Sequence, residues 1–272
     1  RKCRATAPPV GGAGGAGVLV CLEDVTPGYV AGQMRRDFVA NVSHELRTPL
    51  TALLGFIDTL QGPARDDPKA RDRFLGVMAR EAQRMNRLVG DLLSLSRVEF
   101  SERQLPDQSI DLLEVLSAAR ATVTPEDRDG AVQVDASALG DVPELVQGDP
   151  DQLRQVFNNL LENALKYGGV DRPVDVSVSV VAQDLYLRCR AVRVDVQDHG
   201  PGFASHHIPR LTERFYRVDT HRSRELGGTG LGLAIVKHIV QRHRGRLVIT
   251  STQGEGACFS VIIPTLARAK DA

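Results

Sequence analysis

The sequence predicts a long helical hairpin followed by a separate α/β domain, so the fold class combines an α part with an α/β part. The chain has 272 residues, which exceeds one compact domain and suits two folding units. Two apolar stripes with helical spacing occupy residues 34–104, and valine-rich strand patterns alternate with helices over residues 107–266. Residues 1–33 precede the hairpin as a linker region, and residues 267–272 form a tail.

The composition excludes several classes of protein. Lys plus Arg and Asp plus Glu both total 34, and this zero net charge argues against a nucleic-acid binder. Hydrophobic residues at 42% and charged residues at 25% exclude wholesale disorder. No apolar run approaches the roughly 20 residues that cross a bilayer, so we expect a soluble segment. The cysteines contain no Cys-x-x-Cys pair and predict reduced thiols rather than a zinc site; they are Cys3, Cys21, Cys189 and Cys258.

The first part of the chain predicts a loop, a short strand and two long helices. Residues 1–17 are rich in glycine and proline and predict a flexible loop, and residues 18–25 (VLVCLEDV) predict a strand with no partner nearby in the sequence. From Met34 an apolar stripe predicts a helix that ends near Gly62, and a second helix follows a turn over residues 61–69. Two helices cannot bury such stripes on both sides, so we expect a homodimeric four-helix bundle. The stripes are Phe38, Val42, Leu46, Leu50, Leu53, Ile57 and Leu60, and then Phe74, Met78, Met85, Leu88, Leu92, Leu95 and Val98.

The second part of the chain predicts alternating helices and strands with one long irregular stretch. That stretch, residues 198–228, has about thirty residues without clear periodicity, which is typical of a functional loop. The predicted helices cover residues 110–123, 150–167 and 230–242, and the predicted strands cover residues 174–181, 187–196, 246–251 and 257–264.

His44 lies in the segment SHELRTP, in the middle of the first long helix. It falls outside the apolar stripe, so we expect it to face solvent, where a histidine is by itself an ordinary surface residue. Pro49 lies about one turn further on and cannot bond to the Glu45 carbonyl, at a cost of about 3 kcal/mol. The resulting kink beside a His-Glu pair indicates that local geometry matters. The zinc-protease pattern His-Glu-x-x-His is excluded, because Thr48 stands at its last position.

Asn159, Asn163 and Lys166 are spaced by four and three residues and therefore share one face of a predicted helix. Asparagine is a poor residue for a helix interior because its side chain competes for backbone hydrogen bonds. Amide oxygens facing a Mg²⁺-bound triphosphate, with the ammonium on a phosphate, would explain the pattern. The plain alternative is a polar helix face.

Two glycine-rich segments follow. The segment DHGPG, which starts at Asp198, comes directly after a predicted strand, where glycines let the backbone approach a planar ligand and a carboxylate can accept a hydrogen bond from an exocyclic amine. The segment GGTGLGL, residues 227–233, precedes a helix whose N-terminus could hold phosphates. Either segment alone is also compatible with an ordinary turn. The second does not follow a strand, as the dinucleotide-binding fingerprint requires, and the chain has no P-loop ending.

In this order, the four segments resemble the H, N, G1 and G2 boxes of bacterial two-component sensor histidine kinases, and residues 213–217 (ERFYR) resemble their F box. The resemblance spans residues 34–264. Residues 36–46 (RDFVANVSHEL) are most similar to the PhoR-like phosphate-regulon sensor kinases, in which a PAS domain precedes this helix. Residues 1–33 would then hold the C-terminal tail of a PAS-like domain and a linker. The resemblance implies the cytoplasmic portion of an inner-membrane-anchored bacterial protein, attached to the membrane only through segments absent from this chain.

The resemblance also implies a fold and a role for each motif. The fold would be a dimeric histidine-phosphotransfer hairpin followed by a GHKL (Bergerat-type) α/β sandwich that binds ATP. His44 would be the phosphoacceptor, and Glu45 the base that polarises its imidazole. Thr48 would orient a water toward the aspartyl phosphate of a docked regulator, which implies a phosphatase activity as well. The plainer role for Thr48 is to cap the backbone around Pro49.

ATP and Mg²⁺ are the implied cofactors. The asparagines would hold Mg²⁺, Lys166 a phosphate, Tyr167 the adenine ring and Asp198 the adenine amine. Glycines of the third motif would shape the adenine pocket, and those of the fourth would wrap the triphosphate beneath a lid. The residues implied to bind ATP or Mg²⁺ are Asn159, Asn163, Lys166, Tyr167, Asp198, Gly200, Gly202, Phe215, Gly228, Gly230 and Gly232.

The implied function is ATP-dependent autophosphorylation of a histidine and phosphotransfer to a response-regulator aspartate, with phosphate as a candidate signal. The implied partners are a second copy of the chain and a receiver domain. One alternative is a GHKL-type ATPase without histidine phosphotransfer, against which the intact His44-Glu45 pair argues. Another is an inactive dimerisation and docking module, against which the complete set of nucleotide motifs argues. We expect the remaining histidines at the surface or in the lid: His199, His206, His207, His221, His238 and His243.

Overall fold

A computed structural model describes residues 2–7, 9–12, 15–18, 20–100, 105–124, 130–139, 144–168, 172–219 and 228–266. The chain divides into two compact units, Arg1–Met85 and Asn86–Ala272. Within the described part of the chain, no helix combines the length and the apolar character that crossing a membrane requires. All four cysteines are free.

The first unit begins with short paired strands. β1 (Cys3–Thr6) pairs antiparallel with β4 (Cys21–Asp24), and β2 (Pro9–Gly12) pairs antiparallel with β3 (Gly15–Val18). The predictions of a loop over residues 1–17 and of an unpartnered strand over residues 18–25 are therefore wrong. The partner strand β1 has only four residues, and its sequence CRAT lacks an alternating apolar pattern, so the sequence does not reveal it.

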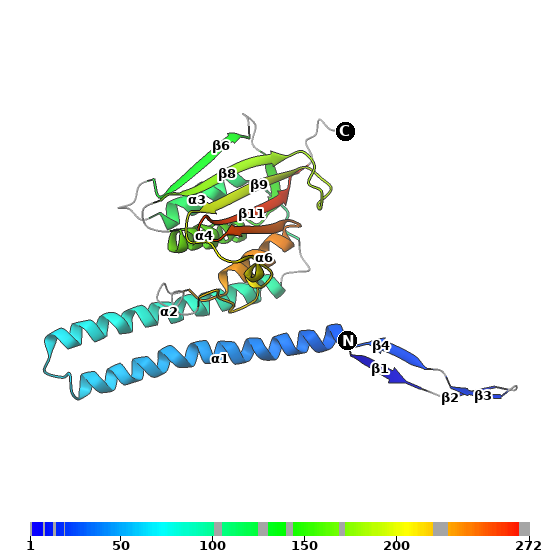
Figure 1. Ribbon diagram of the computed structural model, residues 1–272, viewed down its shortest axis with the longest axis horizontal. Helices are drawn as coiled ribbons and strands as arrows, with labels where there is room; N and C mark the ends of the chain where they lie inside the picture. Colours follow the sequence, from blue (N-terminus) through cyan, green and yellow to red (C-terminus); the bar gives the residue numbers. More distant parts are fainter. Residues whose placement is uncertain are drawn as a thin grey trace. The chain divides into compact units, whose positions relative to one another are not determined.

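α1 (Thr26–Gln61) forms the first arm of the hairpin (Figure 1). It begins earlier than the predicted start at Met34, because strand β4 leads directly into it. The backbone N–H of Thr26 donates to Asp24 Oδ1 at 2.9 Å at this junction. The helix continues through Pro49, which lies inside its span.

α2 (Pro68–Phe100) forms the second arm, and its residues from Asn86 onward belong to the second unit. At the start of α2, Asp67 Oδ1 accepts hydrogen bonds from the backbone N–H groups of Lys69 at 3.0 Å and Ala70 at 3.1 Å. Such a carboxylate satisfies N–H groups that have no partner within the helix. The turn that the sequence predicts over residues 61–69 therefore ends at a helix whose start is capped by Asp67.

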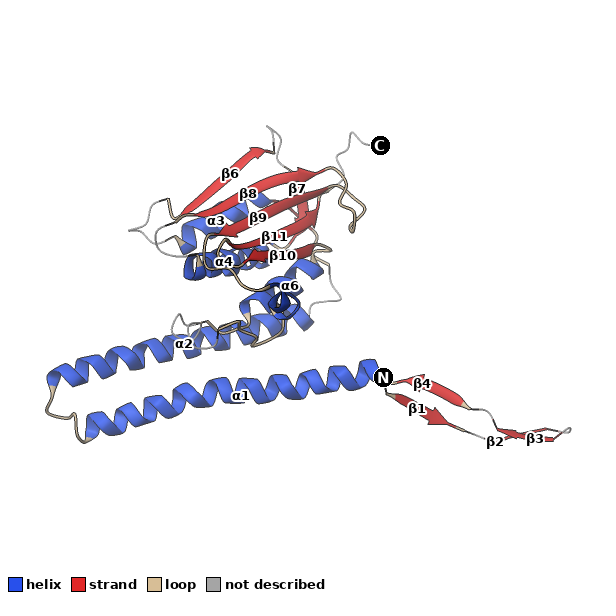
Figure 2. Ribbon diagram, in the orientation of Figure 1, coloured by secondary structure: helices blue, strands red, loops and turns tan. Residues whose placement is uncertain are grey.

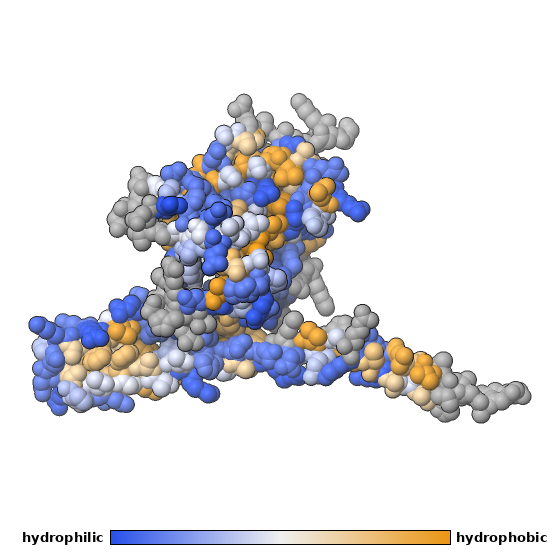
Figure 3. Space-filling model, viewed as in Figure 1, coloured by the Kyte–Doolittle hydropathy of each residue, from blue (hydrophilic) through white to orange (hydrophobic). Residues whose placement is uncertain are grey.

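Apolar side chains lie both between the arms of the hairpin and on its surface. Within the first unit, the rings of Phe56 and Phe74 are 5.4 Å apart between centroids. Leu50, Leu54 and Ile57 are instead exposed, and apolar residues gather on this part of the surface (Figure 3). One copy of the hairpin thus leaves part of its apolar stripe uncovered.

The second unit is a two-layer α/β sandwich (Figure 2). Its five-stranded sheet has the order β10-β11-β9-β8-β6, in which β6 and β8 are parallel and all other neighbours are antiparallel. The strands are β6 (Val132–Ala138), β8 (Val174–Val181), β9 (Ala191–Asp198), β10 (Arg246–Thr252) and β11 (Gly256–Pro264). Three helices cover one face of the sheet: α3 (Leu112–Val123), α4 (Pro150–Tyr167) and α6 (Gly232–Arg242). The short strands β5 (Gln108–Asp111) and β7 (Leu145–Gly148) form a second sheet, and η2 (Ser205–Arg210) is a 3₁₀ helix.

The core of this unit lies between the sheet and α4. In β8 the side chains of Val174, Val176 and Val178 are buried, as expected for alternate residues on one face of a strand. The apolar face of α4 is buried too and consists of Leu153, Val156, Phe157, Leu160, Leu161 and Ala164. α4 therefore turns its opposite, polar face away from the sheet.

The bounds of α4 and β8 agree with the sequence prediction, whereas the strand predicted over residues 187–196 lies at Ala191–Asp198. The shift has a local cause. Asp184 Oδ1 accepts hydrogen bonds from the backbone N–H groups of Tyr186 at 3.0 Å and Leu187 at 2.9 Å, which closes a turn where the apolar pattern predicts strand.

Candidate functional site

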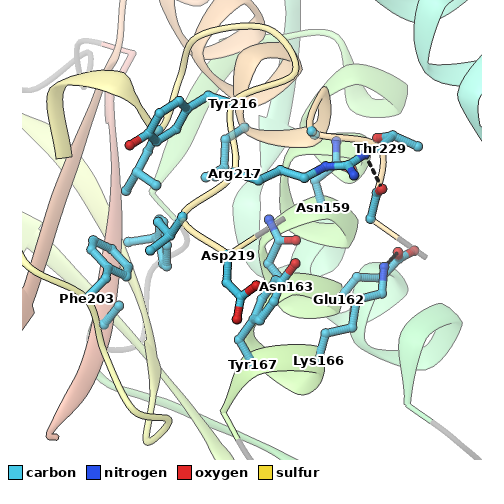
Figure 4. Close-up of a pocket in the computed structure, with 18 of the residues that line it drawn as sticks. Asn159, Glu162, Asn163, Lys166, Tyr167, Phe203, Tyr216, Arg217, Asp219 and Thr229 are labelled. Carbon is cyan, nitrogen blue, oxygen red and sulfur yellow. Dashed lines mark hydrogen bonds and ion pairs between the residues drawn. The ribbon is translucent and has the colours of Figure 1, made fainter. Parts of the chain in front are cut away.

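A cavity of about 570 Å³ opens in the second unit (Figure 4). This volume falls in the usual range for small-molecule sites. Its walls come from α2, α4, the loop after β9, the glycine-rich segment before α6, and β11. The predicted site residues among its lining are Asn159, Asn163, Lys166, Tyr167, Asp198, Gly202, Gly228, Gly230 and Gly232. The segments around Asn159, Asp198, Tyr216 and Gly230 thus meet at one cavity, and the segment around His44 is not part of its lining.

α4 supplies most of the polar wall. Asp149 caps this helix, since its Oδ1 accepts the backbone N–H groups of Asp151 at 3.0 Å and Gln152 at 3.1 Å. Figure 4 shows the polar side chains of α4 directed into the cavity. Lys166 Nζ lies 3.1 Å from Glu162 Oε2, so the ammonium already has a carboxylate partner one turn back. Sequence reasoning missed Glu162, which also lines the cavity.

Asn159 provides a test of whether the site suits a metal-bound phosphate. Its Nδ2 atom is buried without a hydrogen-bond partner, and a Cβ at Gly232 would lie 3.3 Å from its Oδ1. An unsatisfied buried amide costs about 1–3 kcal/mol, which a polar ligand would remove. Amide oxygens are hard donors of the kind that Mg²⁺ accepts beside phosphate oxygens. The amide donors of Asn159 and Asn163 therefore fit a cation that also binds phosphate oxygens, and among the described residues there is no group of three or more His, Cys, Asp or Glu that could hold a metal ion.

Asp198 occupies a buried corner of the cavity and is only 5% exposed. Burial raises the pKa of its carboxyl, although its Oδ1 accepts backbone N–H groups from Gly200 at 2.9 Å and Ala257 at 3.2 Å. A carboxylate fixed in this way can accept a hydrogen bond from the amine of a base. Gly200 does not line the cavity and acts through packing, since a Cβ there would lie 2.1 Å from the Tyr167 carbonyl oxygen.

The glycine-rich segment is held from the opposite loop. Arg217 Nη2 donates to the Gly228 carbonyl oxygen at 2.6 Å. Gly230 has a φ of +74°, and a Cβ there would lie 2.9 Å from the Phe215 Cα, so both conformation and space require glycine. The predicted lid, with Gly227 and His221, lies outside the described residues.

Phe215 supports the cavity from outside its lining. Its backbone N–H donates to the Gly230 carbonyl at 2.8 Å, and the side chain that lines the cavity is the neighbouring Tyr216. The Tyr216 hydroxyl lies 2.7 Å from His207 Nδ1, and the Arg210 guanidinium lies 4.2 Å from the centroid of its ring. Sequence reasoning named the F box but not Tyr216 as the residue that reaches the ligand space.

His44 lies exposed on α1 in the first unit, as predicted. The Thr48 hydroxyl donates to the His44 carbonyl oxygen at 3.1 Å, which is the backbone bond that its plainer role requires. Glu45 Oε2 lies 2.7 Å from Arg84 Nη2 on α2, and both side chains are largely buried. The H-box carboxylate is thus anchored to the second arm of the hairpin.

His243 is buried and only 4% exposed, so the expectation that it lies at the surface or in a lid is wrong. Its Nδ1 lies 2.7 Å from the Ile239 carbonyl oxygen, and its Nε2 accepts the backbone N–H of Asp149 at 3.0 Å. These partners require the neutral tautomer with the proton on Nδ1. Burial lowers the pKa of His243 accordingly. The histidine therefore supports the N-terminus of α4.

Two family descriptions match the chain. The His Kinase A (phospho-acceptor) domain matches residues 34–101, and the Histidine kinase-, DNA gyrase B-, and HSP90-like ATPase matches residues 148–267. The sensor protein kinase WalK of Staphylococcus aureus is 37% identical over 251 residues, which are 91% of this chain. The chain belongs to the sensor histidine kinases.

This histidine kinase is also similar to solved structures of the family. AdeS of Acinetobacter baumannii matches with a TM-score of 0.60 and 25% identity, over 82% of this chain and 98% of AdeS. ShkA in complex with AMPPNP matches with a TM-score of 0.55 and 25% identity, over 86% of this chain and 46% of ShkA. The predicted fold class, a helical hairpin followed by an α/β ATPase-type domain, is confirmed.

The chain spans 58% of the length of that WalK and 40% of a longer WalK from S. aureus strain JH9. These relatives are WalK proteins, so they support the sensor kinase family but not the PhoR-like subtype.

Proposed function

We propose that the chain is the kinase core of a two-component sensor, which transfers the γ-phosphoryl group of ATP to His44 and then to an aspartate of a response-regulator receiver domain. The observation that carries this proposal is the convergence of Asn159, Asn163, Lys166 and Asp198 on one cavity, in a chain that also presents an exposed histidine in a phospho-acceptor domain. ShkA, which was solved with the ATP analogue AMPPNP, supports a nucleotide in that cavity.

The residues of the cavity suit the parts of ATP. Asp198, at the end of β9, would accept a hydrogen bond from the adenine amine, and Tyr167, at the C-terminal end of α4, would contact the ring. Lys166 and the glycine-rich segment from Gly228 to Gly232 line the cavity and would hold the phosphates. Asn159 and Asn163 would hold Mg²⁺ through their amide oxygens, and the bound cation would neutralise charge on the phosphates.

The reaction at His44 needs a neutral imidazole, which is a competent nucleophile near pH 7. A ring nitrogen of His44 forms the N–P bond as the bond from the γ-phosphorus to the ADP oxygen breaks. Glu45 would accept a hydrogen bond from the other ring nitrogen and take up its proton, for which its carboxylate must share or leave its ion pair with Arg84. The receiver aspartate then accepts the phosphoryl group, and the exposure of His44 supports access by such a partner.

The proposal includes a homodimer, a second activity and a membrane anchor outside this chain. The exposed apolar side chains of Leu50, Leu54 and Ile57 support a second hairpin as the partner of the first. Thr48 would support phosphatase activity toward the regulator by orienting a water. The proposed order of domains is residues 34–104 for phosphotransfer and 107–266 for ATP binding, on the cytoplasmic side of the membrane. Phosphate sensing remains a prediction of the sequence alone.

Labelling with γ-³²P ATP tests the central step. The chain should acquire a label that is acid-labile and alkali-stable, as a phosphoramidate is. His44→Gln should abolish the label and retain ATP binding, whereas His206→Gln, at another exposed histidine, should be labelled like the wild type. A label that persists in His44→Gln, or that resists acid, would contradict the proposal. ATP hydrolysis without any label would favour the GHKL-type ATPase instead.

A further inference from the structure

The C-terminal turns of α2 form one wall of the nucleotide cavity, although the sequence assigns them to the hairpin. Arg87, Gly90 and Asp91 line the cavity together with the residues of α4. Asp91 Oδ2 accepts a hydrogen bond from the Thr229 hydroxyl at 2.6 Å. Burial raises the pKa of Asp91, and this hydrogen bond acts in the opposite direction. The carboxylate is therefore a packed part of the site rather than a solvated surface group.

Thr229 connects that carboxylate to the glycine-rich segment. Its Oγ1 also accepts the backbone N–H of Leu231 at 3.3 Å, immediately before α6 begins at Gly232. One hydroxyl thus donates to α2 and accepts from the backbone that leads into α6. Gly228, Gly230 and Gly232 have no side chains to fix their conformation, so this pair of bonds adds to those from Arg217 and Phe215 that restrain the segment.

The end of α2 is firmly attached to the rest of the second unit. The Ser94 hydroxyl donates to Gln155 Oε1 on α4 at 2.7 Å, and Glu99 forms an ion pair with Arg214. Leu95 and Val98 are buried between these polar links along the helix. Asp91 therefore projects from a fixed support, and its position is set independently of Thr229.

The charge of Asp91 argues for positioning rather than for direct contact with phosphate. The charged groups that face it are Glu162, Lys166 and Arg87. A carboxylate repels a triphosphate, so attraction of the ligand cannot explain the presence of Asp91 in the cavity wall. We infer that Asp91 is a positioning residue, which holds Thr229 and through it the backbone of residues 228–232 in the geometry that receives the phosphates. This inference rests on the proposed nucleotide site.

The test is fluorescence titration of the full chain with trinitrophenyl-ATP and Mg²⁺. Thr229→Val keeps the shape of the side chain but removes the hydroxyl, and Asp91→Ala removes the acceptor. Each should raise the Kd about tenfold. This fold-change corresponds to the low end of the free energy that a hydrogen bond to a charged group contributes. The double variant should bind no more weakly than either single variant, since both remove the same bond. Thr229→Ser and Asp91→Asn keep a hydroxyl or an acceptor and should stay within about twofold of the wild type.

Ser94→Ala is the matched control, because it breaks another link of α2 at a residue that does not line the cavity. It should keep the wild-type Kd, and no variant should lose more than about 6 °C in melting temperature. Three results would each overturn the inference. The first is wild-type affinity in Thr229→Val and Asp91→Ala, and the second is additive losses of affinity in the double variant. The third is a tenfold loss of affinity in Asp91→Asn or Ser94→Ala. Absence of binding by the wild type would instead refute the proposed nucleotide site.

Discussion

The burial of His243 predicts that acid lowers the free energy of unfolding of the second unit. A substitution of this one residue should remove its part of that pH dependence. A free histidine has a pKa near 6.5, and burial lowers the pKa of His243 in the folded chain. Between these two values the unfolded chain binds the extra proton and the folded chain does not. The contribution of His243 to stability is therefore fully present above pH 6.5 and is lost as the pH falls below it.

The loss of stability is limited by the uptake of one proton on the His243 ring. Protonation would place a second N–H against the backbone N–H of Asp149, which His243 Nε2 accepts at 3.0 Å in the neutral form. A single proton changes the free energy of unfolding by at most about 1.4 kcal/mol per pH unit. Integrated from pH 7.5 to 5.5 across an unfolded pKa of 6.5, the loss is at most about 1.4 kcal/mol.

Urea unfolding followed by circular dichroism at pH 7.5, 6.5 and 5.5 measures this loss. His243→Gln cannot titrate, so its free energy of unfolding should fall less with acid than that of the wild type, whatever the other groups contribute. His206→Gln, at an exposed histidine, should follow the wild-type pH dependence. Parallel curves for the wild type and His243→Gln over this range would refute the reasoning.

Three further predictions concern the proposed reaction. Asn163→Asp should lower the autophosphorylation rate at least about tenfold, because a carboxylate repels the phosphates and alters the metal donors, and unchanged labelling would rule out its metal role. Thr48→Ala should keep the autophosphorylation rate within a few-fold of the wild type and slow regulator dephosphorylation about tenfold, or roughly 1.4 kcal/mol in the barrier. Equal losses of both activities would indicate that Thr48 acts only through its hydrogen bond to the His44 carbonyl. Leu54, which is 56% exposed in a single chain, should be buried in the dimer, so Leu54→Glu should give a monomeric mass in light scattering where the wild type is dimeric; a wild-type monomer at micromolar concentration would contradict the bundle.

Local signals in the sequence predict much of the second unit. The bounds of α4 follow from the capping residue Asp149 and a clear apolar period, and those of β8 follow from alternating valines. The polar face of α4 could be predicted too, because Asn159 and Asn163 share one side of a helix. Those residues do line the cavity.

The features that sequence reasoning missed depend on contacts between distant segments. The period of α2 indicates which of its faces is apolar, but it cannot indicate that Asp91 meets Thr229 across 138 positions of the sequence. His243 looks like a polar residue at a helix end, and only the Asp149 amide, 94 positions away, explains its burial. In both cases a side chain typical of the surface gains its partner from tertiary structure.

The boundary between the two units falls inside α2, between Met85 and Asn86, and not in the segment that follows the helix. A chimeric kinase joined just before Pro106 would therefore combine the ATP-binding sheet of this chain with a foreign α2. Its glycine-rich segment would face whichever side chain the new helix carries in place of Asp91. For such a swap, the structural unit that keeps the cavity wall intact begins near Asn86 and includes about four turns of α2.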